Sequence, residues 1–231
     1  MASKNLPDTP HYSGHRQRLK DRFRKGGVEA VADYELLELL LYSAIPRRDV
    51  KPLAKALIAR FGSFAEVISA PTEQLNEMTG IGNSVVISLK LVEAAAQKLA
   101  LGKIMDKPIL SNWQALIDYC QIQMGHLKNE QFRILFLDRK NRLIADEKQQ
   151  EGTIDHTPVY PREVIKRALE LHATAIILVH NHPSGDPSPS RDDVEMTKRI
   201  EDAGQQLGVM LHDHLIISKS GQTSLKTMGL I

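Results

Sequence analysis

The 231-residue sequence contains a single cysteine, few aromatic residues and little net charge. With only Cys120 available, an intrachain disulfide is excluded, and so are zinc sites built from four cysteines or from two cysteines and two histidines. The Pro-Cys-x-x-Cys signature of zinc-dependent nucleobase deaminases is absent too. A net charge of +2 is too small to argue for a nucleic-acid partner by itself.

Long apolar runs are also missing from the sequence. No segment approaches the ~20 apolar residues of a membrane span, and the first residues, "MASKNLPDTPHYSGHRQRLK", lack the apolar core of a signal peptide. We therefore expect a cytoplasmic protein without a membrane partner. A chain of this length and 42% hydrophobic content can bury a core unaided, so a bound metal would serve chemistry rather than folding.

The order of periodic segments predicts two domains after a polar, proline-containing mobile tail at residues 1–13. Residues 14–102 have helical periodicity throughout, with stops near Pro46 and Gly62. A linker near "LGKIMDKP" leads to a second domain over 109–231, in which helices and strands are mixed. The predicted fold class is α+β: an all-helical N-terminal domain, then an α/β domain with a mixed sheet flanked by helices.

Two features of the helical domain raise the question of DNA binding. The segment "GHRQRLKDRFRK" carries six Lys/Arg against one Asp, which fits either a solvated helix face or a phosphate-binding patch. The turn Gly80, Ile81 and Gly82 resembles a helix-hairpin-helix motif, whose glycines leave backbone N–H groups free to meet a phosphate. The nearest downstream base is Lys90, so a structural or protein-binding hairpin stays an equal alternative.

The second domain has a readable order of elements. Ser111 is expected to cap a helix over 111–124, and the alternation of Phe132, Ile134 and Phe136 predicts a strand before a hairpin turn at "DRKN". The elements expected after it are a short strand near 152–154, a helix from Pro161, a buried strand at 174–180, a helix from Ser190 to Gly208 and a strand at 209–218.

The stretch "ILVHNHPSGDPSPSRDD" at 177–193 has the spacing of a metal site. On a strand, His180 and His182 project to the same side with Cα atoms roughly 6–7 Å apart, so both imidazoles can reach one ion at ~2.0–2.1 Å. Ser190 stands where a helix begins, and Asp193 follows three residues later. Two histidines and one carboxylate leave a fourth tetrahedral position for water, which is the open arrangement of a catalytic zinc.

A simpler interpretation of the same stretch stays open. Ser190 and Asp193 also form a capping-box pattern, and histidines at a strand end can be plain polar residues. The letters His-Asn-His at 180–182 do not indicate an HNH nuclease, because those three residues are dispersed in that fold rather than consecutive.

The pattern His180-x-His182, seven residues, Ser190, two residues, Asp193 is similar to the JAMM motif of MPN-type metalloproteins. Over nearly the whole chain the sequence resembles the RadC family, most closely in "VHNHPSGDPSPSRDD", "YPREV", "FLDRKN" and "LHDHLIIS". The resemblance implies one zinc per chain, held by His180, His182 and Asp193.

The resemblance also implies a glutamate just before the first strand, matched here by Glu130, which handles the proton of the attacking water. Ser190 would hydrogen-bond the developing oxyanion or the water. Glu151 and Glu163 are rival candidates, and a strand-edge surface acid is the simpler role for Glu130. His212 and His214, which alternation places on one face opposite Asp213, fit a polar core role, support of the site or a second ligand set.

Two functions follow from these patterns. The first is a zinc-dependent hydrolase that cleaves an amide or isopeptide bond in a peptide or protein. The alternative is a DNA-binding accessory protein of DNA repair, with a non-catalytic or structural zinc and DNA contacted through the helical domain. A metal-dependent nuclease ranks last, because the sequence has no two-metal carboxylate cluster.

Overall fold

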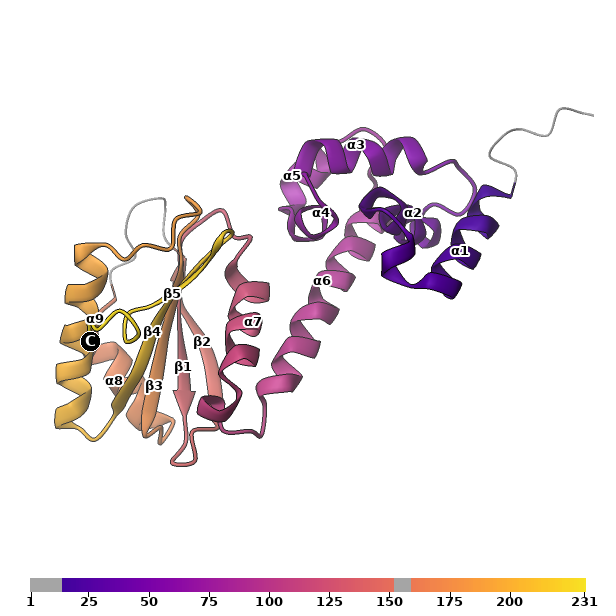
Figure 1. The fold of residues 1–231 in the computed structure, drawn as a ribbon. Coiled ribbons are helices and arrows are strands. Elements are labelled where there is room, and N and C mark those ends of the chain that lie inside the picture. The colour runs from indigo at the N-terminus through magenta and orange to yellow at the C-terminus, as the bar shows by residue number, and fades with distance from the viewer. Residues whose placement is uncertain (1–13, 152–158) are drawn as a thin grey trace, which may run out of the picture. The chain divides into compact units, whose positions relative to one another are not determined.

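The computed structural model describes residues 14–151 and 159–231 and divides the chain into two compact units, Met1–Ala94 and Ala95–Ile231 (Figure 1). The described part of the first unit is helical, and the second unit holds a mixed sheet with flanking helices. The predicted α+β fold class is therefore confirmed. The expected tail at 1–13 and the short strand near 152–154 lie outside the described residues.

The first unit packs short helices around a leucine-rich core. Its elements are α1 (His15–Gly26), η1 (Val28–Ala30), α2 (Asp33–Ala44), α3 (Lys51–Phe61), α4 (Phe64–Ser69), α5 (Thr72–Asn76) and the start of α6 (Asn83–Ile104). Leu37, Leu57 and Leu75 from three of these helices are fully buried. Gly62 ends α3 with φ of +107°, a backbone conformation that favours glycine, as its place in the sequence predicted.

Helix α6 runs across the division between the two units. The units divide between Ala94 and Ala95, whereas the sequence suggested a linker near 101–108. Ala100 and Ile104 near the end of α6 are buried in the core of the second unit, so this part of the helix packs with the sheet domain. A helix that is shared by two cores keeps its periodicity throughout and gives no sign of the division in the sequence.

The second unit alternates helices and strands. Its elements after α6 are η2 (Ile109–Asn112), α7 (Trp113–Met124), β1 (Gln131–Leu137), β2 (Leu143–Glu151), α8 (Pro161–Glu170), β3 (Ala175–Asn181), α9 (Arg191–Gln206), β4 (Met210–Ser218) and β5 (Gly221–Ser224). None of the helices within 14–151 and 159–231 combines the length and apolar character that crossing a membrane requires.

The prediction that Ser111 caps the first helix of this domain is wrong. Helix α7 begins at Trp113, after the short 3₁₀ turn η2, and its capping position is Asn112. The Ser111 hydroxyl instead donates a hydrogen bond of 2.8 Å to the carbonyl of Pro108 within that turn. Serine side chains commonly bond nearby backbone groups in this way, and here the Pro108 carbonyl takes up the hydroxyl before the helix begins.

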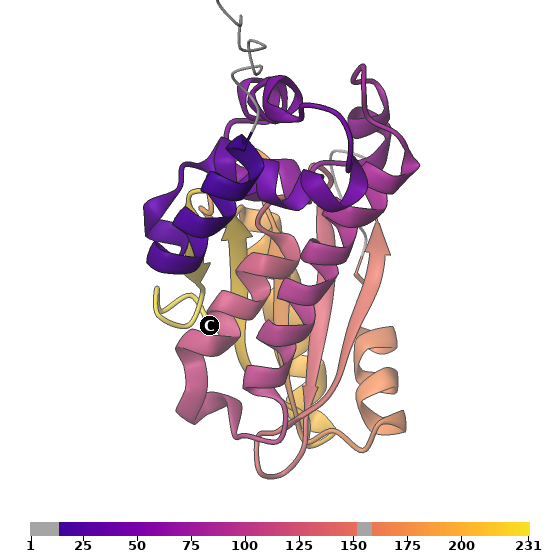
Figure 2. The same cartoon turned by 90° about the vertical axis from the view of Figure 1, so that its right-hand side faces the viewer.

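The sheet has the strand order β2-β1-β3-β4-β5, and only the β3–β4 pair among the strands described is parallel. Helix α7 covers one face and helices α8 and α9 cover the other (Figures 1 and 2). Side chains alternate between these layers: Ile177 and Val179 pack against α7, while Ile176 and Leu178 pack with α8 and α9. His180 continues the second series and therefore faces the side of α9.

Candidate metal centre

Strand β3 delivers the two histidines to one end of the sheet. All seven residues of β3 are buried, and His180, the next-to-last residue of the strand, is 1% exposed. His182 follows the strand, and its N–H donates to the carbonyl of Ile217 on β4 at 2.8 Å. The ladder thus holds the backbone of both histidines, two residues apart, on the same side of the sheet.

Hydrogen bonds hold the turn after His182 on both of its sides. Gly185 has φ of +91°, which a side chain would disfavour. The hydroxyl of Ser220, beyond β4, donates to the carbonyl of Gly185, and the carbonyl of Asp186 accepts a 2.8 Å hydrogen bond from Nδ1 of His182. The turn therefore fixes the ring of His182 as well as reversing the chain.

Helix α9 begins with the capping box that the sequence suggested. The Ser190 hydroxyl oxygen accepts from the N–H of Asp193 at 3.1 Å, and Oδ2 of Asp193 accepts from the N–H of Ser190 at 2.7 Å. The Ser190 hydroxyl also donates to Oδ2 of Asp193 at 2.6 Å. These bonds orient the Asp193 carboxylate toward β3.

Three donor atoms converge at this corner. Nε2 of His180 lies 2.9 Å from Nε2 of His182 and 3.3 Å from Oδ1 of Asp193, and Nε2 of His182 lies 3.7 Å from Oδ2 of Asp193. The ligand atoms of a tetrahedral zinc with bonds of ~2.0–2.1 Å are roughly 3.3 Å apart. The observed separations bracket that value, and all three donors lie within 4.8 Å of one another. The residues fit a metal ion of the zinc type.

The electrostatics of the three residues are those of a cation site. Burial lowers the pKa of His180 to about 4, so this ring is neutral at physiological pH. The hydrogen bond with Asp193 raises the pKa of His182. Burial opposes ionisation of Asp193, but three effects outweigh it and lower the pKa of Asp193: its hydrogen bond with His182, the charge that His180 carries once it is protonated at low pH, and the bonds from Ser190. Two ring nitrogens and a carboxylate meeting at one point need a proton or a metal between them.

Glu130 lies beside this group, at the position that the sheet register gives it. Strand β1 pairs antiparallel with β3, and Phe132 is opposite His180. Extending that register by two residues places Glu130 opposite His182, on the same face of the sheet. Glu130 is half-buried, and its charge adds to the effect of Asp193 in raising the pKa of His182.

The rival glutamates are placed differently. Glu163 is in the first turn of α8, its side chain is 52% exposed, and it pairs with Nε of Arg162 at 3.3 Å. The side chain of Glu151 lies outside the part of the structure that is described. Of the three candidates, Glu130 is the one that an extension of the β1–β3 register brings opposite His182.

Asn181 was not singled out by the sequence, although it stands between the two histidines. Its side chain points to the opposite side of the strand from theirs, and it is 1% exposed. Its Oδ1 accepts from the N–H of Gln131 at 2.9 Å, and its Nδ2 donates to the carbonyl of Asn129 at 3.1 Å. These bonds hold the backbone on both sides of Glu130, so Asn181 positions that segment.

The three residues at 212–214 have separate roles. A register shift in the β3–β4 ladder interrupts the alternation, so Leu211 and His214 face α9, in place of the expected pair His212 and His214. Nε2 of His212 is 2.7 Å from Oδ1 of Asn141 in the β1–β2 turn. The Asp213 carboxylate accepts from the N–H of His214 and from the hydroxyl of Ser224. His214 alone of the three touches the metal group, through Nδ1 of His180 at 2.8 Å.

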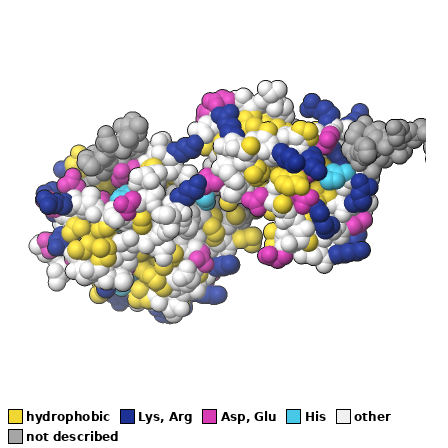
Figure 3. Space-filling view, turned by 45° about the horizontal axis from the view of Figure 1, so that its top comes forward, with side chains coloured by type: hydrophobic (Ala, Val, Ile, Leu, Met, Phe, Trp, Pro, Cys, Tyr) yellow, Lys and Arg dark blue, Asp and Glu magenta, His cyan; other side chains and the backbone are white. Residues whose placement is uncertain are grey.

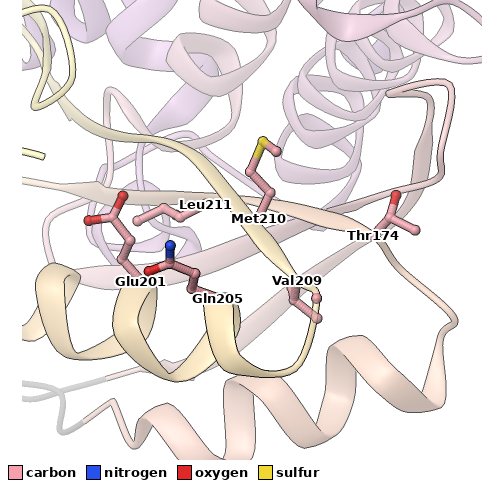
Figure 4. Close-up of a pocket in the computed structure, with 7 residues that line it drawn as sticks. Thr174, Glu201, Gln205, Val209, Met210 and Leu211 are labelled. Carbon is pink, nitrogen blue, oxygen red and sulfur yellow. The ribbon is translucent and has the colours of Figure 1, made fainter.

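A separate cavity of about 330 Å³ lies at the other end of the same strands (Figure 4). In Figure 4, Glu201 and Gln205 project from α9 toward Leu211. The lining residues are Thr174, Glu201, Gln205, Gly208, Val209, Met210 and Leu211. Because strands rise ~3.3 Å per residue, the length of β3 separates Thr174 from His180 by roughly 20 Å. This cavity is not part of the metal centre.

The helix-hairpin-helix-like turn joins α5 to α6 in the first unit. Gly80 has φ of +91°, Ile81 packs against the core of the unit, and Gly82 precedes α6. Lys90, the nearest downstream base, donates to the carbonyl of Ile68 at 3.1 Å and to Glu93. Gly80 alone of the two glycines has a positive φ, and the N–H of Ile81 donates to the carbonyl of Met78 at 3.2 Å. The nearest lysine is engaged inside the unit.

The basic segment at 16–25 has partly structural contacts. The Arg16 guanidinium donates to the carbonyls of Ile45 and Pro46 at the end of α2, and Arg22 pairs with Glu35. On the face drawn in Figure 3, Lys and Arg side chains are interspersed with acidic and apolar ones. Part of this segment therefore serves to hold α1 against α2.

Comparison with known proteins finds one family match in each part of the chain. Residues 110–230 match the family described as RadC-like JAB domain, and residues 13–87 match the family described as UPF0758 N-terminal. A UPF0758 protein of Rhodobacter capsulatus is 60% identical over 213 residues, which cover 92% of this chain and the whole length of that relative.

Proposed function

The chain belongs to the RadC family, with a RadC-like JAB domain in its second unit, and from that premise we propose that this domain is a zinc-dependent hydrolase. Its substrate is an amide or isopeptide bond in a peptide or protein. The observation that supports this most directly is the convergence of His180, His182 and Asp193, which are three ligands and so leave a fourth position open.

The exposure of the three side chains indicates the side from which a substrate enters. The His180 side chain is 1% exposed, whereas those of His182 and Asp193 are 19% and 14% exposed. The buried ring anchors the site, and the two partly exposed groups border the opening. Extending the β1–β3 register by two residues places Glu130 opposite His182, the more exposed of the two histidines.

Zinc, when bound, would lower the pKa of a coordinated water to ~7 and polarise the substrate carbonyl. Glu130 then takes a proton from the attacking water and returns it to the amine nitrogen as the carbon–nitrogen bond breaks. Ser190 supplies a hydrogen bond to the oxyanion. Its hydroxyl donates to Oδ2 of Asp193 at 2.6 Å in this structure, so it must rotate about its Cα–Cβ bond to do so.

The test combines metal analysis with a search for cleaved proteins. We expect close to one zinc per chain in the purified protein and much less in Asp193→Ala. We also expect cleavage products in cell extract that Glu130→Gln, which keeps the ligands, does not release. A protein that holds no stoichiometric zinc, or an Asp193→Ala variant that retains it fully, would contradict the proposal.

DNA binding through the first unit is a second candidate function. It is supported by the backbone of the turn, where Gly82, Asn83 and Ser84 are exposed at the start of α6. Duplex binding should then weaken steeply with salt, by a slope of roughly 0.9 for each phosphate neutralised, and should be unaffected by Glu130→Gln. Failure to bind any DNA at low salt would remove this candidate and leave the hydrolase unaffected.

A further inference from the structure

A buried row of hydrogen bonds extends behind His180, away from the metal position. Nδ1 of His180 lies 2.8 Å from Nε2 of His214, and Nδ1 of His214 lies 2.6 Å from the hydroxyl oxygen of Thr197. The Thr197 hydroxyl in turn donates to the carbonyl of Asp193. His180, His214 and Thr197 are 1%, 0% and 0% exposed, so water does not compete for these bonds.

The direction of every proton in this row follows from its far end. A carbonyl oxygen only accepts, so the Thr197 hydroxyl gives its proton to Asp193 and can only accept from His214. A neutral imidazole has one N–H, and burial makes the charged form costly. His214 therefore carries its proton on Nδ1, and its Nε2 accepts from Nδ1–H of His180. The lone pair of His180 is then on Nε2, the atom that faces His182 and Asp193.

We propose that Thr197 and His214 are positioning residues that fix the tautomer of His180 and so keep its Nε2 lone pair on the metal position. This inference rests on the proposed zinc site. In the reverse polarity, His214 donates from Nε2 to Nδ1 of His180, and His180 would then present an N–H to the metal. That polarity would require the Thr197 hydroxyl to donate to His214, but the hydroxyl already donates to the main-chain carbonyl of Asp193.

The fold brings the members of this row together by two separate devices. Asp193 and Thr197 are four residues apart on α9 and so share one face of the helix. In the β3–β4 ladder, Ile176 pairs with Leu211 but Ile177 pairs with Asp213, so the register slips by one residue. After the slip His214 pairs with Leu178, which faces α9. Without it His214 would pair with Val179 and face α7.

Phe132 covers the two rings of the row. Its ring lies 6.0 Å from that of His180 at an interplanar angle of 13°, and 5.6 Å from that of His214 at 65°. His182 is held differently: its Nδ1 donates directly to the carbonyl of Asp186 in the turn. The two histidines are therefore oriented independently, His180 by the buried row and His182 by the turn.

The experiment compares Thr197→Val with Thr197→Ser, because valine keeps the branched shape without the hydroxyl and serine keeps the hydroxyl. We expect the zinc dissociation constant, measured by chelator competition, to rise ~10–100-fold in Thr197→Val and to stay within about threefold of wild type in Thr197→Ser. His214→Gln, whose Oε1 can accept from His180, should retain more affinity than His214→Leu. Circular dichroism and thermal unfolding of each zinc-free variant verify that it is folded.

A second readout does not depend on any variant. Nitrogen-15 NMR of the histidine rings in the zinc-free wild type should find His180 and His214 each protonated on Nδ1. His180 protonated on Nε2, or a folded Thr197→Val variant with wild-type zinc affinity, would overturn the inference. If wild type binds no zinc at all, the proposed function fails, and the tautomers still decide whether the row has the stated polarity.

Discussion

Asn181→Ala should separate the integrity of the metal ligands from the position of Glu130. The Asn181 side chain bonds the N–H of Gln131 at 2.9 Å and the carbonyl of Asn129 at 3.1 Å, and these two backbone groups flank Glu130. Its own side chain takes no part in the converging metal group. We expect the substitution to loosen the segment that carries Glu130 while His180 and His182 stay in place.

The cost in stability can be worked out from the burial of the two partners. Gln131 is 7% exposed, so its N–H without a partner costs roughly 1–3 kcal/mol. Asn129 is exposed, and water can replace most of the bond to its carbonyl. The free energy of unfolding should therefore fall by about 2–3 kcal/mol, which lowers Tm by roughly 5–10 °C in a chain of this size. The matched control is Asn129→Ala, which removes an exposed side chain from the same segment and should cost under ~0.5 kcal/mol.

The position of Glu130 can be followed without a substrate. After the hydrogen bond with Asp193, the charge of Glu130 is among the causes that raise the pKa of His182. An NMR titration of the His182 ring in zinc-free protein should therefore give a lower pKa in Glu130→Gln than in wild type, and a lowered pKa also in Asn181→Ala. Asn129→Ala should titrate like wild type. If folded Asn181→Ala had both the stability and the His182 pKa of wild type, the positioning role of Asn181 would be refuted.

Three further outcomes are expected at the same corner. Ser190→Ala should remove the cap of α9 and lower the free energy of unfolding, measured in urea, by about 1 kcal/mol. Zinc should still bind because the three ligands remain, and loss of zinc would contradict this. The folded pKa of His180 is about 4, below the value of 6.5 for a free histidine, so the unfolded chain binds more protons between these values. The contribution of His180 to the stability of the zinc-free protein should therefore be full above pH 6.5 and fall toward pH 4, by about 3 kcal/mol. His214 adds in the same direction, whereas His182, whose pKa is raised, acts in the opposite one. A urea profile that stays flat between pH 6.5 and pH 4 would refute it. Zinc affinity should also fall as His182, whose pKa is raised, takes up a proton, and calorimetry in two buffers should detect proton release on binding.

Local patterns predicted most of the second domain and the three converging residues. The alternation of Phe132, Ile134 and Phe136 identified a strand whose apolar face packs with α8 and α9. The two-residue spacing of His180 and His182 placed both rings on one side, and a helix start at Ser190 turned Asp193 toward them. Each of these relations spans only a few residues, so the periods of strand and helix were sufficient to predict it.

The residues behind the ligands could not be predicted in the same way. The contact between His180 and His214 depends on a parallel pairing and on a one-residue slip in its register, which no local spacing encodes. Strict alternation would instead have placed His214 on the same face of the strand as His212. Thr197 had a usable signal, since it lies four residues after Asp193 on the same helix and its hydroxyl donates to the Asp193 carbonyl. The donor to that hydroxyl is His214, which only the placement of β4 brings to it. The N–H of Gln131 that Asn181 binds is likewise set by the β1–β3 register.

The capping and metal-binding interpretations of the corner turn out to be compatible, because an ionised carboxylate has lone pairs for both. Oδ2 of Asp193 accepts from the N–H and the hydroxyl of Ser190, while Oδ1 lies 3.3 Å from Nε2 of His180. The cap thus restricts the rotation of the Asp193 side chain before any ion arrives, and the lowered pKa keeps it ionised. A ligand held in its binding orientation by its own helix loses little conformational freedom on binding a cation. The helix start therefore contributes to metal affinity through the same bonds that stabilise the fold.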